Sequence, residues 1–262
     1  MLLVLRSTAF YLGYASATIL WGALSVLTAW VLPYRLRFQF IIGCWTRFSL
    51  WWLRVTCGIS HVVDGLENLP DKACVVLVRH ESTWETLFLQ TLLAPQATLI
   101  KRELLWLPFF GWAFRLLKPI AIDRRSPRGA LKRLIREGRS RLADNIWVVM
   151  FPEGTRMPPG IVGKFQIGGA ALANAADSPI IVIAHNSGSR WPAHRFLKSP
   201  GIIQVTISPP LLPTDSTSKA LTLQANDTLR EMMAALPNDG NQTSRFTTDN
   251  AFASMNSRRG ST

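Results

Sequence analysis

The chain has 262 residues, of which 48% are hydrophobic and 17% charged, and its 29 Lys and Arg outnumber its 16 Asp and Glu. This composition excludes a disordered polybasic protein, which would combine high charge with low hydrophobicity. It favours a folded domain whose basic surface meets anionic headgroups or acidic partners. The three cysteines, Cys44, Cys57 and Cys74, are too scattered for a disulfide framework or a metal site. We therefore expect no metal and no cofactor.

The N-terminal part of the chain differs from the rest, because no acidic residue precedes Asp64. The stretch from Ser7 to Leu32 contains no charge and exceeds the ~20 residues that cross a ~30 Å hydrocarbon core. A cleaved signal peptide would have a shorter apolar region. We predict a retained transmembrane helix over about residues 7–32.

A second apolar segment, about residues 38–59, is interrupted by Arg47 and Arg54. Arginines are unfavourable at the bilayer centre but tolerated at its surface, so we predict an amphipathic interfacial helix. A second membrane helix is the alternative. Four arginines follow the first helix and one precedes it, so the positive-inside bias places the remaining chain in the cytoplasm. Residues 1–61 are thus expected to form a membrane anchor.

From residue 62 onward, short runs rich in Val and Ile alternate with helical patterns. Predicted strands are Cys74–Val78, Thr98–Ile100, Ile120–Ile122, Ile146–Met150, Ile180–Ala184 and Ile202–Ser208, and predicted helices are Ser82–Leu93, Pro127–Ala143, Gly168–Ala176 and Ser218–Leu236. Most strands are apolar on both faces, which is typical of a parallel or mixed sheet. The alternation predicts an α/β domain over residues 62–236, with a mixed, largely parallel sheet covered by helices. The polar residues 237–262 predict a disordered tail.

Four predicted strands end at clusters of polar residues, which are Arg79–Glu85, Asp123–Arg125, Phe151–Arg156 and His185–Gly188. If these strands are parallel, the four clusters gather at one edge of the sheet. Open α/β sheets bind their ligands at the carboxyl ends of the strands. The sequence therefore predicts a functional site at that edge.

His80 and Glu85 are candidates for a base and the group that orients it. On a regular helix their side chains would point about 140° apart. They meet only if His80 lies in a loop and Glu85 in the first turn of a helix capped by Ser82. The carboxylate would then fix the imidazole tautomer and stabilise the imidazolium. The alternative is a capping box, in which Glu85 only accepts a bond from the backbone N–H of Ser82. A zinc protease is excluded, because Trp84 stands where the second histidine is required.

The segment Phe151–Arg156 predicts a tight turn at the sheet edge. Pro152 cannot continue a strand ladder, and Gly154 permits a close approach or an unusual backbone conformation. Glu153 and Arg156 flank the turn, and a guanidinium suits a phosphate or a carboxylate. A structural ion pair between these two side chains is the alternative.

Residues 101–141 contain twelve Lys or Arg residues, including Arg124 and Arg125, but only three acidic residues. The helix predicted at 127–143 has a basic outer face. That face could serve solubility alone, or it could meet anionic lipid or an acidic protein. Nucleic acid is not an expected partner, since no recognisable binding motif is present.

Taken in order, these motifs resemble the glycerolipid acyltransferases, and most of all the bacterial 1-acylglycerol-3-phosphate (lysophosphatidate) acyltransferases. The resemblance runs from about Cys74 to Pro213 and rests on H-x4-acid, I-D-R, F-P-E-G-T-R and P-I-x-V. It implies a domain on the cytoplasmic face of the bacterial inner membrane. The donor would be acyl-CoA or acyl-acyl carrier protein, the acceptor the free hydroxyl of lysophosphatidic acid, and the product phosphatidic acid.

The resemblance also implies roles for individual residues. His80 would be the general base and Glu85 its orienter, and the glycerol phosphate would be held by Arg124, Glu153, Gly154, Thr155 and Arg156. Two residues depart from the family pattern, Arg79 in place of Asn and Glu85 in place of Asp. Another lysolipid or a lyso-ornithine lipid is an alternative acceptor, and a non-catalytic basic scaffold on the membrane is the alternative from another class.

Overall fold

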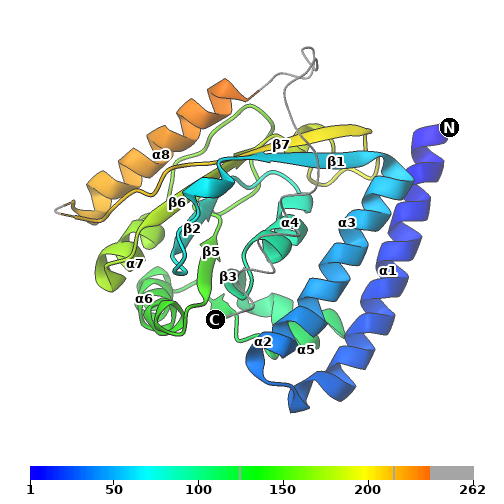
Figure 1. The fold of residues 1–262 in the computed structure, drawn as a ribbon, viewed down its shortest axis with the longest axis horizontal. Coiled ribbons are helices and arrows are strands. Elements are labelled where there is room, and N and C mark those ends of the chain that lie inside the picture. Colours follow the sequence, from blue (N-terminus) through cyan, green and yellow to red (C-terminus); the bar gives the residue numbers. More distant parts are fainter. Residues whose placement is uncertain (124, 215, 237–262) are drawn as a thin grey trace.

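In the part of the chain that the structure describes, seven strands form a mixed sheet between two layers of helices (Figure 1). This computed structural model describes residues 1–123, 125–214 and 216–236. Arg124 and the predicted tail, residues 237–262, lie outside the described residues. The predicted fold class, an α/β domain with a largely parallel sheet covered by helices, is confirmed.

The strands lie across the sheet in the order β1-β7-β6-β2-β5-β3-β4. The strands from β6 to β4 in this order are parallel, whereas β7 pairs antiparallel with β6 and parallel with β1. Their bounds are β1 Ile59–Asp64, β2 Val75–Val78, β3 Gln96–Lys101, β4 Ile120–Ile122, β5 Trp147–Met150, β6 Ile180–His185 and β7 Gly201–Ile207. The six predicted strands match β2 to β7 closely, and β1 is the strand that the prediction missed.

Alternate residues of each central strand are buried on opposite faces of the sheet. In β2, Val76 and Val78 belong to the core on one face of the sheet, whereas Val75 and Leu77 belong to the core on the other face. Burial on both faces explains why these strands are almost wholly apolar. The covering helices are α1 Leu2–Thr28, α3 Cys44–Cys57, α4 Trp84–Leu92 and α5 Phe110–Arg115 on one face, and α6 Pro127–Ala143, α7 Gly168–Ala176 and α8 Ser218–Ala235 on the other.

The second N-terminal helical segment has different bounds from those predicted. Helix α2, Tyr34–Phe38, continues through the π-helical turn Gln39–Gly43 into α3. Gly58, with φ of 66°, ends α3 in the left-handed conformation that favours glycine. Ile59 then begins β1 and is not part of the helix. The predicted segment 38–59 therefore starts too late, since the helical stretch begins at Tyr34. It also ends too late, because Ile59 belongs to β1, which is defined by its pairing with the distant strand β7.

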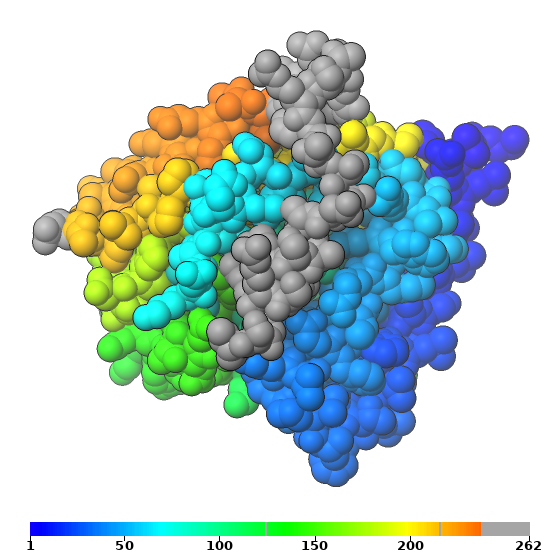
Figure 2. Space-filling view, in the orientation of Figure 1, coloured from blue at the N-terminus to red at the C-terminus, as the bar shows by residue number. Residues whose placement is uncertain are grey.

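The first helix and its extension, Leu2–Val31, are long and apolar enough to span a membrane by length and composition. Helices α1 and α3 pack side by side and form one flank of the molecule (Figures 1 and 2). Several large apolar side chains of this flank are exposed, among them Leu12, Leu20, Trp30 and Trp51. This flank is therefore suited to contact with lipid.

A buried lysine connects α1 to the α/β domain. The ammonium of Lys198 lies 3.5 Å from the ring centroid of Tyr11 and 4.7 Å from those of Phe10 and Trp191. Its backbone N–H donates to the hydroxyl of Ser7 at 3.1 Å. Burial lowers the pKa of Lys198 to about 8. Cation–π contacts and this hydrogen bond therefore fix the N-terminal half of α1 on the loop between β6 and β7.

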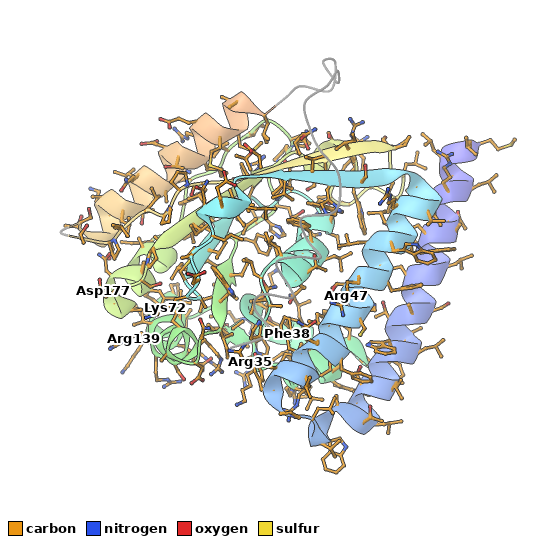
Figure 3. All side chains as sticks on the ribbon, in the orientation of Figure 1. Arg35, Phe38, Arg47, Lys72, Arg139 and Asp177 are labelled. Carbon is orange, nitrogen blue, oxygen red and sulfur yellow. The ribbon has the colours of Figure 1, made fainter. Side chains whose placement is uncertain are left out.

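Helix α6 has the two faces that its sequence predicts. Leu134 is buried in the core, whereas Lys132, Arg136 and Arg139 are exposed. Figure 3 shows Arg139 on α6 and Arg47 on α3, on opposite sides of the molecule. The basic face of α6 thus lies apart from the apolar flank formed by α1 and α3.

Candidate active site

Three of the four predicted polar clusters meet at the carboxyl edge of the sheet. They follow β2, β5 and β6, and these strands are parallel neighbours. The fourth cluster follows β4, which lies at the edge of the sheet beyond β3. Of that cluster, Arg125 is exposed and its backbone N–H donates to the Asp123 carboxylate at 2.9 Å. Arg124 lies outside the described residues, so the structure does not place it.

His80 and Glu85 are in direct contact. Nδ1 of His80 lies 2.8 Å from Oε1 of Glu85, and because a carboxylate only accepts, the imidazole donates. The ring of His80 stacks on that of Phe151, with centroids 4.0 Å apart. The side chain of His80 is 16% exposed, whereas that of Glu85 is wholly buried. Nδ1–H is thus committed to Glu85, which leaves Nε2 as the basic nitrogen at the accessible ring.

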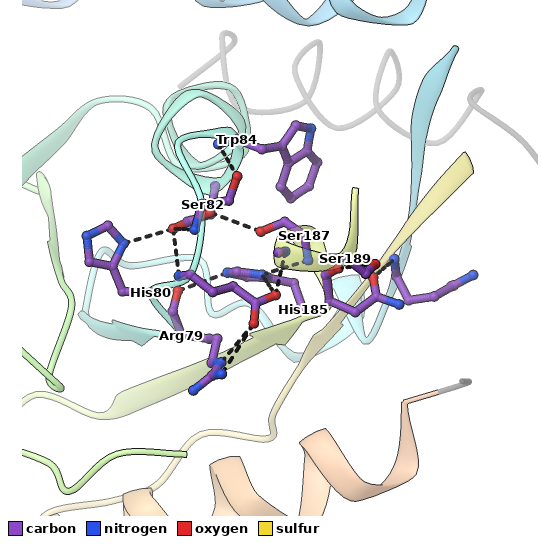
Figure 4. Close-up of polar contacts among 12 residues, drawn as sticks. Arg79, His80, Ser82, Trp84, His185, Ser187 and Ser189 are labelled. Carbon is purple, nitrogen blue, oxygen red and sulfur yellow. Dashed lines mark hydrogen bonds and ion pairs between the residues drawn. The ribbon is translucent and has the colours of Figure 1, made fainter. Parts of the chain in front are cut away.

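Glu85 also binds backbone N–H groups just before α4, whose N-cap residue is Thr83 and not the predicted Ser82. Its Oε1 accepts bonds from the backbone N–H groups of Glu81 at 3.1 Å and Ser82 at 2.9 Å. The hydroxyl of Ser82 in turn accepts from the backbone N–H of Trp84 at 3.1 Å (Figure 4). The two contacts that the sequence offers as alternatives, one with His80 and one with the backbone N–H of Ser82, are therefore made by the same side chain.

The pKa of Glu85 is lowered despite complete burial. Burial acts to raise it, but the hydrogen bond from His80, the charges of His185 and His80, and the N–H group of Ser82 outweigh that effect. Each of these interactions favours the ionised carboxylate. Glu85 is therefore an anion next to the imidazole, as an orienting group must be.

Arg79 lies wholly buried behind this pair. Its guanidinium contacts Glu81 at 3.3 Å and Glu153 at 2.8 Å, and it donates to the carbonyls of Pro158 and Ile161 at 2.8 and 2.6 Å. The planar guanidinium has enough donors to serve all four groups at once. Arg79 thus links the loop after β2 to the segment that follows β5.

Glu153 faces into the protein. Besides Arg79, it accepts from the backbone N–H groups of His80 at 3.1 Å and Gly163 at 2.8 Å. Both carboxylate oxygens are therefore occupied by groups of this chain. A role for Glu153 in holding the substrate stays a prediction, and the observed contacts support an indirect one through the backbone of His80.

The rest of the turn is more open. Gly154 has φ of 75°, in the region that favours glycine, and a Cβ built there would meet nothing within 4 Å. Thr155 is exposed. Nη2 of Arg156 contacts the hydroxyl of Thr83 at 3.3 Å, and its Nε is buried without a hydrogen-bond partner among the described residues. A buried guanidinium N–H without a partner is unfavourable, and an anion that reached it would gain a charge-assisted hydrogen bond.

Two further residues of the site belong to the polar cluster after β6, for which the sequence predicts no individual roles. The hydroxyl of Ser187 donates to Oε2 of Glu85 at 3.0 Å. Nε2 of His185, which is 1% exposed, donates to the carbonyl of Arg79 at 2.9 Å. The available signal was a polar run directly after a wholly apolar strand, but local sequence does not show which strand lies beside β6.

The arrangement supplies a base with an ionised partner, at the edge of a sheet and beside an arginine. Ser82 and Ser187 use their hydroxyls within the network, and Cys74 is buried in the core. Among the described residues, no group of three or more His, Cys, Asp or Glu side chains could hold a metal ion. The chemistry that this geometry supports is deprotonation of a bound hydroxyl.

The chain belongs to the acyltransferase family, whose family model matches residues 60–186, and it is an acyltransferase. It is similar to the 1-acyl-sn-glycerol-3-phosphate acyltransferase of Pseudomonas aeruginosa, with 50% identity over 78% of this chain and 80% of that protein. It is also similar to the 1-acyl-sn-glycerol-3-phosphate acyltransferase of Limnanthes alba, with 31% identity over 75% of this chain and 69% of that protein. The crystal structure of the 1-acyl-sn-glycerophosphate (LPA) acyltransferase PlsC from Thermotoga maritima has the same fold, with a TM-score of 0.73, 21% identity, and coverage of 88% of this chain and 94% of that one.

Proposed function

We propose that this protein transfers an acyl group from an acyl thioester to the free hydroxyl of 1-acylglycerol-3-phosphate, giving phosphatidic acid. The observation that carries the proposal is the contact of 2.8 Å between His80 and Glu85 in a chain half identical to an enzyme named for this reaction. The donor is either acyl-CoA or acyl-acyl carrier protein.

In the proposed mechanism, Nε2 of His80 takes the proton of the acceptor hydroxyl while the oxygen attacks the thioester carbonyl. The new C–O bond forms a tetrahedral intermediate, and Glu85 stabilises the imidazolium. When the intermediate collapses, the C–S bond breaks and His80 returns the proton to the departing thiolate. No acyl-enzyme is required, which agrees with the commitment of Ser82 and Ser187 to hydrogen bonds within the site.

The glycerol phosphate is assigned to the side of the site that carries Arg156. Two observations support this assignment. The Nε of Arg156 is buried and has no hydrogen-bond partner among the described residues, and the backbone at Gly154 and Thr155 is open. Arg124 is proposed as a second phosphate ligand from the sequence motif alone. Charge-assisted bonds from guanidinium groups favour a phosphate over a neutral head group.

The acceptor is a membrane lipid, and we propose that residues 1–61 anchor residues 62–236 at the cytoplasmic face of the bacterial inner membrane. Support comes from the apolar flank of α1 and α3 and from a second exposed apolar group at Leu104, Trp106, Leu107 and Trp112. Exposed Lys101, Arg102 and Arg115 lie in the same segment and suit anionic lipid.

Deletion of residues 1–32 tests the anchor. We expect tight membrane association to become partial, and the remaining binding to weaken with salt through screening of the basic surface. If the shortened protein resists an alkaline carbonate wash, residues 38–59 themselves span the bilayer.

The reaction is tested with purified protein, a radiolabelled acyl-CoA or acyl-acyl carrier protein, and a panel of lyso-acceptors. We expect labelled phosphatidic acid from lysophosphatidic acid and background product from His80→Ala. Preference for a phosphate-free acceptor would assign the enzyme to another lysolipid. Full activity of His80→Ala would contradict the mechanism.

A further inference from the structure

Thr83 is the N-cap residue of α4, but its side chain does not cap the helix. A threonine at this position usually has extended backbone, and its hydroxyl accepts from an N–H group of the first helical turn. The backbone of Thr83 is instead in the right-handed helical region, with φ of −93° and ψ of −20°, and its side chain makes no capping bond. The hydroxyl accepts from Nη2 of Arg156 at 3.3 Å. Thr83 therefore uses its hydroxyl to hold a side chain from the segment after β5.

The guanidinium of Arg156 has little else to fix it. Among the residues that the structure describes, no carboxylate forms an ion pair with Arg156, and its Nε is buried without an acceptor. Within the same part of the chain, the bond to Thr83 is the hydrogen bond that this side chain makes. An arginine side chain has many rotamers, and ordering it costs free energy when a ligand binds. A bond that orders the guanidinium beforehand therefore favours binding.

The two segments that carry Thr83 and Arg156 are joined at two further points, both at the backbone of His80. The N–H of Met157 donates to the carbonyl of His80 at 2.7 Å, and Oε2 of Glu153 accepts from the N–H of His80 at 3.1 Å. These bonds fix the backbone of both segments but leave the side chain of Arg156 free to rotate. The bond from Arg156 to Thr83, three residues after His80, adds the constraint on the guanidinium itself.

We propose that Thr83 is a positioning residue for this acyltransferase, whose hydroxyl holds Arg156 in the orientation that receives the phosphate of the acceptor lipid. The inference rests on the proposed role of Arg156 as a phosphate ligand. Without the hydroxyl, the guanidinium can take other rotamers, and part of the interaction energy of the phosphate is used to order it. The loss of Thr83 should therefore weaken binding of the acceptor and leave the chemical step at His80 nearly unchanged.

The test compares Thr83→Val, which keeps the size of the side chain but removes its hydroxyl, with Thr83→Ser, which keeps the hydroxyl. We expect Thr83→Val to raise KM for lysophosphatidic acid about three- to tenfold, with kcat and melting temperature nearly unchanged. Thr83→Ser should stay close to the unmodified enzyme. The matched control is Thr91→Val, because Thr91 is a half-buried threonine of the same helix whose hydroxyl donates to the carbonyl of Phe88 at 2.7 Å. Its KM should not change.

A lower kcat with an unmoved KM, or equal effects of Thr83→Val and Thr83→Ser, would overturn the proposal. If Thr83→Val does not fold, Thr83→Ala takes its place, with the same expected rise in KM.

A second measurement separates failure of this inference from failure of the proposed phosphate site. Equilibrium binding of lysophosphatidic acid is measured in detergent without an acyl donor, for Thr83→Val, Arg156→Ala and the double variant. We expect both single variants to bind more weakly and the double variant to bind as Arg156→Ala does, because the hydroxyl acts through the guanidinium.

If Arg156→Ala weakens binding and Thr83→Val does not, the inference is overturned and the phosphate site stands. If the two losses add in the double variant, Thr83 acts independently of Arg156 and the inference is again overturned. Normal binding by Arg156→Ala would remove the phosphate site and the inference together.

Discussion

The hydroxyl of Ser187 donates a hydrogen bond of 3.0 Å to Oε2 of Glu85, across 102 positions of the chain. The other oxygen of Glu85 receives His80 at 2.8 Å, so the two contacts hold the carboxylate from both sides. Ser187→Ala removes one donor to a buried anion, a loss of roughly 1.5 kcal/mol. We expect kcat to fall about tenfold with KM nearly unchanged, because Ser187 is buried and its hydroxyl is bonded to Glu85. Ser187→Thr, which keeps the hydroxyl, should retain more activity, and equal losses in both variants would argue against this role.

Glu85 contacts His80 and also accepts from two backbone N–H groups just before α4, and two substitutions separate its proposed catalytic role from its structural one. In Glu85→Gln, the amide oxygen still accepts from the N–H groups of Glu81 and Ser82, but the charge that stabilises the imidazolium is lost. We expect kcat to fall by about 10²–10⁴ with little change in melting temperature. Ser82→Ala should do the reverse, with a loss of about 1 kcal/mol of stability and most activity spared. Near-normal turnover of Glu85→Gln beside an inactive His80→Ala would show that Glu85 is only a cap.

Arg79 forms ion pairs with two buried carboxylates, so its loss should affect the fold more than the loss of an exposed arginine. Arg79→Met leaves Glu81 and Glu153 without their cation, and we expect a loss of about 3–5 kcal/mol in the free energy of unfolding. The control is Arg136→Met on α6, whose side chain is 72% exposed and whose change should stay within about 0.5 kcal/mol. Denaturant titration in detergent measures both, and similar midpoints for the two variants would contradict the structural importance of Arg79.

Arg156 and Arg124 should affect acceptor binding. Arg156→Ala and Arg124→Ala are expected to raise KM for lysophosphatidic acid by roughly tenfold or more through loss of a charge-assisted contact. Arg125→Ala, which removes an exposed charge next to Arg124, serves as the control and should behave as the unmodified enzyme. Unchanged kinetics in both test variants would remove the phosphate from this side of the site.

Lys198 should make the stability of the protein depend on pH. Burial lowers its pKa to about 8, below the ordinary 10.5, so between these values the unfolded chain binds more protons than the folded one. Stability contributed at this site therefore rises as the pH increases from 8 toward 10.5, and it is lowest below pH 8. In Lys198→Met this dependence is absent. The difference in melting temperature, unmodified protein minus variant, should increase between pH 7 and pH 10, and a constant difference would rule out the effect.

The sequence by itself determined most strands and helices of the α/β domain and predicted the proximity of His80 and Glu85. Strands β2 and β5 can be predicted from the sequence because strands buried on both faces consist of consecutive apolar residues. Helix α6 can be predicted from its apolar face of Leu residues and its opposite face of Arg residues. The requirement that His80 precede a helix and Glu85 begin it followed from helix geometry alone. The contact of 2.8 Å agrees with that expectation.

Tertiary structure decided what depends on neighbours distant in the chain. Strand β1 exists through pairing with β7, more than a hundred residues away, so the local pattern at Ile59 predicted a helix end. Only the strand order brings Ser187 and His185 of the β6 edge beneath Glu85, and only packing turns Glu153 inward to Arg79. Hydrogen bonds between side chains depend on their separation in space. The residues around a polar side chain do not show which strand will lie next to it in the sheet, so its partners cannot be predicted from the local sequence.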